Sequence, residues 1–341
     1  MKIGVLGAGS FGTAIANLLT LNGEVLVYAR KQAVVDELNI NHKIKGYEMS
    51  ELVTGTTDLA ELAQTCRLIF PIIPSEFFRT VMRQLAPHIG PGHILIHGTK
   101  GLDVGENFEK ANSISEIKKS VFTMTEVIRQ ETSVIRTGAL AGPNLAKEIL
   151  AGQPAASVLA SDFTEVIDAG RNALSSNKFI VYGSNHLKGV ELAGALKNVI
   201  AIASGLLNGL KFGKNMQALL VTRGLREMII IGQAVGAEAR PFIGTAGIGD
   251  LIATATSEQS RNYTFGHLLS EDKSIDEIKE IMDEVAEGYR TIKFAYKIIN
   301  AAKLDAPVIK TLYQIVYDGI PIRKAMIKLI KSRLSEDVDF L

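Results

Sequence analysis

Residues 2–28 read KIGVLGAGSFGTAIANLLTLNGEVLVY, and this stretch decides the fold. Its first five residues form a short β-like run, glycines follow, and apolar residues then recur at helical spacing. The run at 24–28 has strand character again. This order predicts a strand, a glycine turn, a helix and a second strand, which is the start of an α/β fold with a doubly wound, mostly parallel sheet.

The glycines of this stretch have the spacing of a dinucleotide-binding turn. Gly7, Gly9 and Gly12 satisfy the pattern G-x-G-x-x-G, with a strand before it and a helix after it. Gly7 permits the tight turn, Gly9 lets a pyrophosphate approach the backbone, and Gly12 allows close helix packing. The N–H groups of the helix start then face the phosphates. The alternative is a glycine turn in an α/β protein that binds no cofactor.

The residues after the second strand indicate which dinucleotide is bound. An Asp or Glu at this place bonds the ribose 2′-hydroxyl of NAD, whereas this chain has Arg30 and Lys31. Two cations suit the additional 2′-phosphate of NADP, so NADP is favoured and NAD stays possible. The alternative is that both cations are solvated loop charges.

The rest of the chain continues the sheet and then becomes helical. Further strands are expected at 68–73, at 93–97 and in a run that ends at Ala141. After about Tyr182 long apolar-periodic segments follow, with turns expected at Gly205, Gly209, Gly236 and Gly247. We therefore expect a Rossmann-like domain over residues 1–183 and an all-helical substrate-binding and catalytic domain over 184–341. The polar stretch 103–125 is expected to be a surface insertion.

Composition limits the possible functions. With 47% hydrophobic residues the chain is globular, and 37 Lys and Arg against 36 Asp and Glu leave no net field for nucleic acid or an anionic membrane. No uncharged apolar run reaches the roughly 18 residues of a membrane-spanning helix, and glycines interrupt the apolar N-terminus where a signal peptide would be continuous. Cys66 is the single cysteine, which fits a reducing cytoplasm and a core position.

One lysine stands in a segment that otherwise has the character of a buried helix. In GVELAGALKNVIAIASGLLNG, residues 189–209, Lys197 and Glu191 are the only charges. Burying an ammonium is costly unless it is paired or loses its proton, and either outcome suits a proton-transferring group. The alternative is a lysine whose stem covers apolar surface while its ammonium reaches water. The segment alone leaves both interpretations open.

Two turns that follow strands carry groups suited to a small substrate. Lys100, in GTKGL, comes directly after the strand at 93–97, and ligands of open α/β sheets bind at the carboxyl ends of strands. Gly142 and Asn144, in AGPNLAKE, follow another strand and open a helix. Both turns are expected to face the ligand crevice. The alternative for each is an ordinary strand-to-helix turn.

The helical half has a glycine-rich turn followed by a compact polar set. Asp250 and Thr254, in GTAGIGDLIAT, are four residues apart and share one helical face. Asp250 alone is most simply a helix N-cap. Ser260, Arg261 and Asn262 follow, and Arg261 can form two charge-assisted hydrogen bonds to a phosphate. An isolated loop arginine is usually solvated, so its interpretation depends on the groups beside it.

Five motifs, in this order and at this spacing, resemble the NAD(P)-dependent glycerol-3-phosphate dehydrogenases of the bacterial type. They are GAGSFGTA, GTKGL, AGPNLAKEI, ELAGALKN and GIGDLIATATSEQSRN, and the resemblance covers nearly the whole chain. It implies an N-terminal Rossmann domain joined to a helical domain, and reduction of dihydroxyacetone phosphate to sn-glycerol 3-phosphate by NAD(P)H. It also implies a role in phospholipid synthesis and a homodimer.

The resemblance, together with the patterns above, predicts the site residues. Lys197 is the expected catalytic lysine, with Lys100 and Asp250 beside it. The residues expected at the substrate are Lys100, Gly142, Asn144, Lys197, Asn198, Asp250, Thr254, Ser260, Arg261 and Asn262. Those expected at the cofactor are Gly7, Gly9, Ser10, Phe11, Gly12, Arg30, Lys31, Lys100, Ala146, Arg261, Val285 and Glu287. No metal is expected. Asn144 departs from the Ser or Thr common in bacterial relatives, and 103–125 is longer and more polar than usual.

In this hypothesis Lys197 stabilises the negative charge that develops on the ketone oxygen and supplies the proton, and Arg261 anchors the phosphate with Asn262 and Asn198. Two other interpretations stay open. One is a β-hydroxyacid or ketopantoate-type reductase, whose substrates bear carboxylates. The other is a non-catalytic dinucleotide-sensing protein, in which Lys197 has no role.

Overall fold

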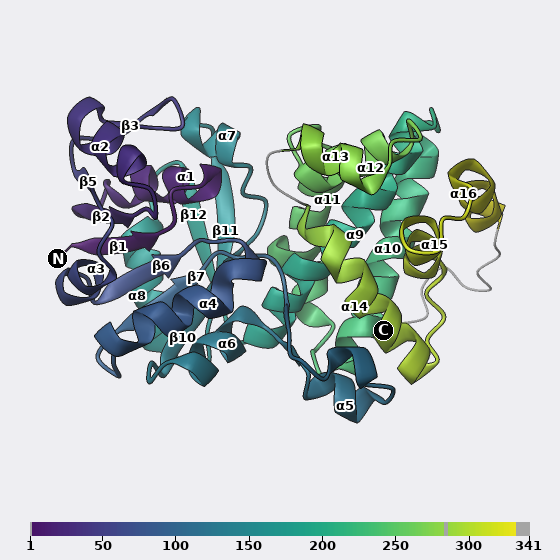
Figure 1. Ribbon diagram of the computed structural model, residues 1–341, viewed down its shortest axis with the longest axis horizontal. Coiled ribbons are helices and arrows are strands. Elements are labelled where there is room, and N and C mark those ends of the chain that lie inside the picture. The colour runs from purple at the N-terminus through teal and green to yellow at the C-terminus, as the bar shows by residue number, and fades with distance from the viewer. Residues whose placement is uncertain (1, 283–285, 332–341) are drawn as a thin grey trace. The chain divides into compact units, whose positions relative to one another are not determined.

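The computed structural model describes residues 2–282 and 286–331, and the chain divides into two compact units (Figure 1). The first unit takes Met1–Asp103 and Phe122–Glu191, and the second takes Val104–Val121 and Leu192–Leu341. The larger part of the second unit therefore begins inside a helix, and the unit also includes residues 104–121, which lie between the two parts of the first unit in the sequence. The division at 183/184 stays a prediction for the limits of the functional domains.

The first unit contains an eight-stranded sheet in the order β12-β11-β10-β7-β6-β1-β2-β5. All neighbouring strands are parallel except β10 and β11. The strands are β1 (Ile3–Leu6), β2 (Val25–Tyr28), β5 (Val53–Thr56), β6 (Leu68–Pro71), β7 (Ile94–His97), β10 (Arg136–Ala141), β11 (Ala155–Ala160) and β12 (Phe179–Ser184). The expected mostly parallel, doubly wound sheet is confirmed. Strands β5, β11 and β12 were not expected.

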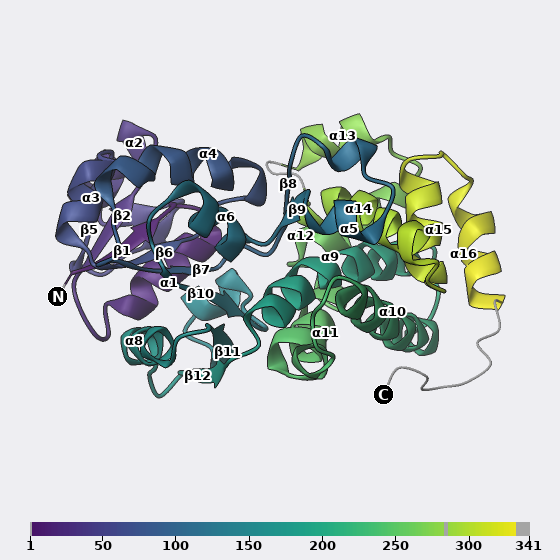
Figure 2. The same ribbon diagram turned by 90° about the horizontal axis from the view of Figure 1, so that it is seen from below.

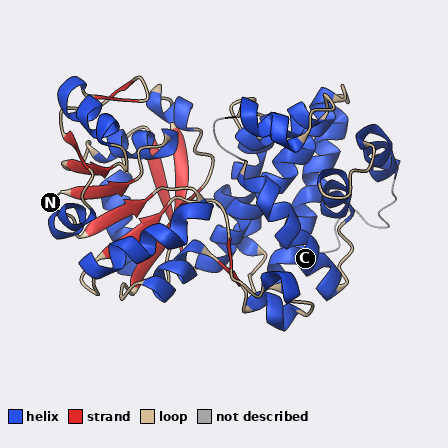
Figure 3. Ribbon diagram, in the orientation of Figure 1, coloured by secondary structure: helices blue, strands red, loops and turns tan. Residues whose placement is uncertain are grey.

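Helices cover both faces of this sheet because its strands bury side chains on both sides (Figure 3). Along β2, Val25 and Val27 belong to one core cluster, and Leu26 between them belongs to the other. The first cluster includes residues of α1 (Ser10–Leu19), α2 (Gln32–Asn41) and α8 (Thr164–Leu174); the second includes α3 (Leu59–Thr65), α4 (Ser75–Leu85) and α6 (Met124–Glu131). Such two-sided burial is typical of parallel strands.

The glycine turn lies where the strand order reverses. Strands β2 and β6 pair with β1 on its two sides, so the end of β1 is the switch point of the sheet. Gly7 has φ +124°, and a Cβ there would lie 2.3 Å from the carbonyl oxygen of Ile72, just after β6. The turns after β2, β7 and β10 follow the same edge, because these strands are parallel to β1. The fold thus brings four predicted ligand segments to one edge.

The second unit is built from helices, apart from part of a short ribbon (Figure 3). They are α5 (Ile114–Lys118), α9 (Leu187–Gly209), α10 (Lys214–Ala234), α11 (Asp250–Ala255), α12 (Arg261–Leu269), α13 (Ile275–Ile281), α14 (Glu287–Ala302), α15 (Pro307–Val316) and α16 (Ile322–Lys331). Helix α9 starts in the first unit and continues into the second. Its length and composition would suit a membrane span, but its apolar stretch is wholly buried inside the protein, as in a core helix of a soluble fold.

The expected turn at Gly205 is wrong, because this residue lies within α9. A Cβ at Gly205 would come 2.0 Å from the carbonyl oxygen of Tyr263, and one at Gly266 would come 2.0 Å from that of Ile202. Both glycines therefore serve the close approach of α9 and α12. Gly236, in contrast, has φ +93° and follows α10 as a true turn.

The stretch 103–125 is more than a surface insertion. It forms the ribbon β8 (Asp103–Val104) with β9 (Val121–Phe122), a 3-10 turn over Phe108–Lys110, and α5, which lies against α14 (Figure 2). Phe108, Ala111 and Ile117 are buried. The Lys297 ammonium of α14 donates to the carbonyl oxygens of Phe108, Glu109 and Ala111. Because the stretch is polar in composition, these three buried residues and the helix α5, which belong to the second unit, were not expected from the sequence.

Candidate active site

The glycine turn of the first unit has the shape that a pyrophosphate requires. A Cβ at Gly12 would meet the carbonyl oxygen of Gly7 at 2.0 Å, so these two glycines pack the turn. A Cβ at Gly9 would meet nothing within 4 Å, so this position leaves open surface. Gly9 is also the N-cap of α1, whose first turn has no acidic residue. The turn therefore fits a dinucleotide whose phosphates lie on Gly9 and on the N–H groups at the start of α1.

Arg30 and Lys31 follow β2 on the same edge. Both are exposed, and Lys31 is the N-cap of α2. Neither forms an ion pair with any residue in the described ranges. Two unneutralised cations at the end of the second strand fit the 2′-phosphate of NADP.

The turns after β7 and β10 meet through Lys100. Its ammonium donates a hydrogen bond of 2.7 Å to the carbonyl oxygen of Gly142. The neighbouring Asn144 accepts a hydrogen bond of 2.9 Å from the Ser157 hydroxyl, while its buried Nδ2 has no partner within the described part of the chain. A buried amide donor without a partner is costly, which supports a ligand acceptor at this point. Ser157, on β11, had no sequence motif and was missed.

In the second unit, Lys197 is buried and paired. It is 4% exposed, and its ammonium donates a hydrogen bond of 2.6 Å to Oδ1 of Asp250, itself 1% exposed. The ammonium also donates to the Thr254 hydroxyl, which donates to the same carboxylate oxygen at 3.2 Å. The interpretation of Lys197 as a lysine reaching water is therefore wrong. A closed buried network of this kind is directional and holds the ammonium in place.

Asp250 does not act as a helix cap. It is the first residue of α11, follows the π-helical turn Thr245–Gly249, and Gly249 occupies the cap position. Its carboxylate instead accepts from Lys197 and Thr254. The predicted shared face of Asp250 and Thr254 is confirmed, because both side chains meet the same ammonium.

The predicted phosphate segment lies at the start of α12. The Ser260 hydroxyl caps this helix by accepting from the N–H of Tyr263, and Arg261 is exposed in the first turn. Asn262 Nδ2 donates to Asn198 Oδ1 at 2.9 Å, and its Oδ1 accepts from the Gly288 N–H at 2.8 Å. The two asparagines thus connect α9, α12 and the first turn of α14. Sequence reasoning missed Gly288.

The late cofactor stretch is described only in part. Val285 lies outside the described residues, and Glu287 is half-buried at the first position of α14. A Cβ at the adjacent Gly288 would lie 2.6 Å from the carbonyl oxygen of Asn198. This glycine lets the start of α14 approach the residue next to Lys197, so the two segments are held together.

Cys66 and Glu227 are buried ionisable groups that lie outside the predicted site. Burial raises the pKa of the Cys66 thiol to about 11, so this cysteine is a neutral core residue at pH 7. Burial also raises the pKa of Glu227 to about 8, although its two oxygens accept from the N–H groups of Val308 and Ile309. Residues 2–282 and 286–331 contain no group of three or more His, Cys, Asp or Glu that could hold a metal ion.

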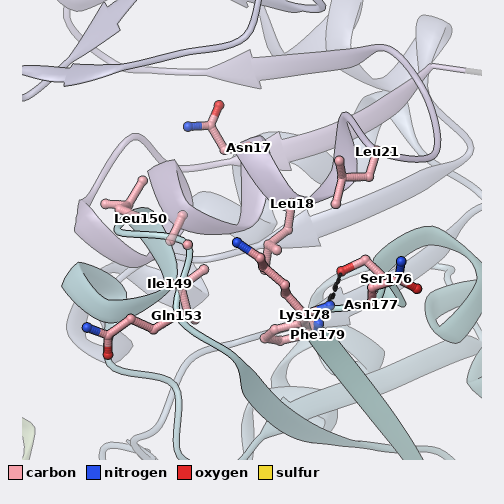
Figure 4. A pocket seen from close by; sticks show the side chains of 12 residues that line it. Asn17, Leu18, Leu21, Ile149, Leu150, Gln153, Ser176, Asn177, Lys178 and Phe179 are labelled. Carbon is pink, nitrogen blue, oxygen red and sulfur yellow. Dashed lines mark hydrogen bonds between the residues drawn. The ribbon is translucent and has the colours of Figure 1, made fainter.

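A cavity of about 390 Å³ lies beside the second half of α1, away from the glycine turn (Figure 4). Its walls come from α1, from α7 (Ala146–Leu150) with the loop after it, and from the start of β12. Leu18, Ile149 and Phe179 are among its apolar lining residues, and Lys178 lines it as well. The cavity includes none of the predicted site residues, so it is separate from the dinucleotide turn.

Comparison with known proteins gives one consistent result. Residues 2–167 match the family described as the NAD-dependent glycerol-3-phosphate dehydrogenase N-terminus, and residues 186–327 match the family described as its C-terminus. The glycerol-3-phosphate dehydrogenase [NAD(P)+] of Acinetobacter baylyi is 36% identical, with 100% of this chain and 93% of that protein covered. That of Nitratidesulfovibrio vulgaris is 35% identical, with 99% and 100% covered.

Solved structures agree with this result. The crystal structure of glycerol-3-phosphate dehydrogenase from Coxiella burnetii has a TM-score of 0.87 at 29% identity, covering 97% of this chain and 99% of that chain. A PanE/ApbA family ketopantoate reductase from Ralstonia eutropha has a TM-score of 0.56 at 13% identity, covering 96% and 99%, and so shares the fold alone. Since both halves match the same family and full-length relatives exceed one third identity, the chain belongs to the NAD-dependent glycerol-3-phosphate dehydrogenase family.

Proposed function

We propose that the protein catalyses the reversible reduction of dihydroxyacetone phosphate to sn-glycerol 3-phosphate with NADPH, and less well with NADH. The observation that carries this proposal is the buried Lys197 ammonium, fixed by Asp250 and Thr254 in the largely apolar helix α9. A carbonyl reduction needs such a group, because negative charge develops on the oxygen and a proton must be supplied. The names of the relatives support the same reaction.

NADPH, when bound, supplies the hydride for the carbonyl carbon. Lys197 would stabilise the developing oxyanion by charge and then donate its proton to that oxygen. Asp250 and Thr254 hold the ammonium in one direction, so that no rearrangement is needed as the charge develops. Gly194 and Ala201 share the helical face of Lys197, and their small size would leave room for substrate.

Arg261 is the proposed anchor of the substrate phosphate. It is exposed at the first position of α12, where the helix N-terminus also favours an anion. Asn262 and Asn198 are proposed to complete the phosphate site, their mutual hydrogen bond keeping both amides in place. The capping hydroxyl of Ser260 still has a proton to donate to the same anion.

On the first unit, Lys100, Gly142 and Asn144 are the proposed substrate contacts. Lys100 is a second cation for the substrate and the cofactor, and the unpaired Nδ2 of Asn144 is a donor to the ligand. The proposed cofactor contacts are Gly7, Gly9, Ser10, Phe11, Gly12, Arg30, Lys31, Lys100, Ala146, Arg261 and Glu287.

The resemblance to the bacterial-type enzymes supports three broader proposals. The product would supply the glycerol backbone of phospholipids, the enzyme would work in the cytoplasm, and it would be a homodimer. Sedimentation equilibrium of the purified protein tests the last of these directly. A monomer at micromolar concentration would contradict it.

Steady-state oxidation of NADPH and NADH by dihydroxyacetone phosphate tests the proposed reaction. We expect turnover with this substrate, a higher kcat/KM with NADPH than with NADH, and no comparable rate with small keto acids. Binding of NADPH without any oxidation by dihydroxyacetone phosphate would contradict the proposal. Faster turnover of a keto acid such as ketopantoate would instead favour a carboxylate substrate.

Arg261→Ala tests the phosphate anchor. We expect KM for dihydroxyacetone phosphate to rise by tenfold or more, on the scale of about 1.5–3 kcal/mol for a charged hydrogen bond. Some loss of kcat should accompany it, because binding at the phosphate also orients the carbonyl. Arg290→Ala, which removes another exposed arginine of the same unit, is the control. A change in NADPH binding alone would assign Arg261 to the cofactor.

A further inference from the structure

A buried polar cluster in the first unit has no part in the reaction as proposed above. It consists of His97, Thr125 and Glu191, all of them buried, and we call it the Glu191 cluster. Glu191 Oε1 lies 2.9 Å from His97 Nε2 and accepts a hydrogen bond of 2.9 Å from the Thr125 N–H. Its other oxygen accepts a hydrogen bond of 2.5 Å from the Thr125 hydroxyl. One carboxylate therefore joins three segments that are far apart in the sequence.

The partners of Glu191 fix its charge state. Burial by itself would raise the pKa of this carboxyl, but the hydrogen bond and charge of His97, with the hydroxyl and N–H of Thr125, lower the pKa below its ordinary value. An ionised carboxylate can only accept, so His97 carries a proton on Nε2 and donates it. His97 Nδ1 is buried and has no hydrogen-bond partner among the described residues, and the ring packs edge-on against Phe78. His97 therefore has Glu191 as its polar contact.

The three members of the Glu191 cluster lie on β7, α6 and α9. His97 is the last residue of β7, directly before the turn that carries Lys100. That turn is held further by the Thr99 hydroxyl, which donates to the carbonyl oxygen of Ile73 at 2.6 Å. Thr125 lies in the first turn of α6. Glu191 lies in α9 six residues before Lys197, or about 9 Å along the helix axis.

Apolar packing would join these segments at a lower energetic cost. Taking a carboxylate out of water is expensive, and hydrophobic residues of similar volume often stabilise a core as well or better. What hydrogen bonds add is direction, because a carboxylate that accepts three donors permits only one arrangement of strand and helix. Such precision is useful where a helix carries a group whose position matters to a fraction of an ångström.

We propose that Glu191, through His97 and Thr125, is a positioning residue for the reaction, which fixes the start of α9 on the end of β7 and so sets the place of Lys197. The proposal rests on the proposed function, because it needs Lys197 to be the catalytic group. Glu191 touches neither substrate nor cofactor in this role. Its loss should therefore lower kcat more than it changes cofactor binding.

Glu191→Gln in the full chain is the first test. The amide keeps the size of the side chain. Its NH2 group, however, would face a donor of His97 or Thr125 at a place where a carboxylate oxygen had accepted a hydrogen bond. We expect kcat with dihydroxyacetone phosphate to fall about tenfold or more, while KM for NADPH stays within about twofold, measured well below the melting temperature. A lower melting temperature with an unchanged kcat would overturn the proposal, because it would show a structural role alone.

Thr125 provides a second test if the Glu191 variant does not fold. Thr125→Val removes the hydroxyl and leaves the backbone N–H, so kcat should fall severalfold, and Thr125→Ser should recover most of it. Thr132→Val, which removes a hydroxyl after the other end of α6, is the matched control. Equal kcat for the Val and Ser variants at position 125 would contradict the positioning role. Lack of activity in the unaltered protein would instead refute the proposed function.

Discussion

The two units present their predicted ligand groups in opposite ways. On the first, the groups are backbone N–H at a glycine turn and the exposed cations Arg30 and Lys31. On the second, apart from the exposed Arg261 and the half-buried Glu287, they are buried side chains, with Lys197 bonded to Asp250 and Thr254. The first unit thus offers surface that does little for its own stability. The second uses the same side chains for its core and for the proposed chemistry.

This difference has a direct consequence for substitutions. Changes on the edge of the sheet should weaken cofactor binding and leave the folded state intact. Changes at the buried residues Lys197, Asp250 and Thr254 should lower turnover and stability together, because a charge that loses its partner in the interior is costly. The first predictions below compare these two kinds of position, and the last concerns Glu227, a buried group outside the predicted site.

Lys197→Met should have the largest effect. The change removes the ammonium, so turnover should fall by on the order of a hundredfold or more while NADPH affinity stays nearly intact. It also leaves Asp250 buried without its cation, which costs about 3–5 kcal/mol of unfolding free energy in comparable cases. Steady-state rates and thermal melts measure the two effects. Lys188→Met, at an exposed lysine of the same helix, is the control.

A double variant separates catalysis from folding at this site. Lys197→Met with Asp250→Leu replaces the ion pair by apolar groups, so the melting temperature should recover in part while turnover stays low. Recovery of turnover in the double variant would show that the ammonium is not the catalytic group.

Gly9→Ala tests the exposed side of the comparison. A Cβ at Gly9 meets nothing within 4 Å, so the fold should tolerate it and the melting temperature should change little. The same Cβ fills the surface where a pyrophosphate approaches, so Kd for NADPH should rise by about tenfold or more, or about 1.4 kcal/mol. Gly92→Ala, also with open space around its Cβ, is the control. An unchanged Kd would remove Gly9 from the cofactor site.

Arg30→Ala should have a smaller and more selective effect. If Arg30 holds the 2′-phosphate, kcat/KM should fall severalfold to tenfold with NADPH and stay nearly constant with NADH. Stability should not change, because the side chain is exposed. Equal losses with both cofactors would place Arg30 elsewhere on the dinucleotide. Lys119→Ala, at an exposed lysine of the other unit, serves as the reference.

Glu227→Gln should show the smallest effect, through pH. Burial raises the pKa of Glu227 to about 8, so the folded state binds its proton more tightly than the unfolded chain, where the pKa is near 4.5. The stability from this proton is complete below about pH 4.5 and is lost as pH rises towards 8. The melting temperature of the unaltered protein should therefore fall relative to Glu227→Gln between pH 5 and 8.

Glu280→Gln, at an exposed position of the same unit, should show no such trend. The absence of any trend between pH 5 and 8 in the comparison with Glu227→Gln would mean that the two N–H groups of Val308 and Ile309 keep the carboxylate ionised in the folded state.

The same contrast explains what the sequence could predict. The glycine turn after β1 and the parallel sheet follow from contiguous local patterns, so their structure was predicted correctly, whereas the cofactor roles of the turn and of the cations after β2 stay predictions. Lys197 stood out as a charge in an apolar helix. Its pairing with Asp250 and Thr254, however, depends on the packing of α9 against α11; only the resemblance to a family suggested Asp250, and nothing suggested Thr254.

Other features have no local pattern. The contact of Ser157 with Asn144 depends on an antiparallel strand that follows a parallel one. The link from Asn262 to Gly288 joins two helices, and neither residue shows its partner in the sequence. Gly205 looked like a turn because glycine usually breaks a helix, while the real constraint was the backbone of Tyr263 on a neighbouring helix. Packing across sequence distance decided each of these cases.

The path of the chain between the units has a consequence for genetic dissection. It passes from one unit to the other after Asp103, after Val121 and after Glu191. A gene fragment that begins at codon 184 would encode α14 without the segment that places Phe108 under Lys297. A fragment that ends at codon 183 would contain residues 104–121 without α14, the helix against which they pack. Halves of the gene therefore do not encode halves of the protein, and recombination between relatives should succeed only when residues 104–121 and the helical half come from the same parent.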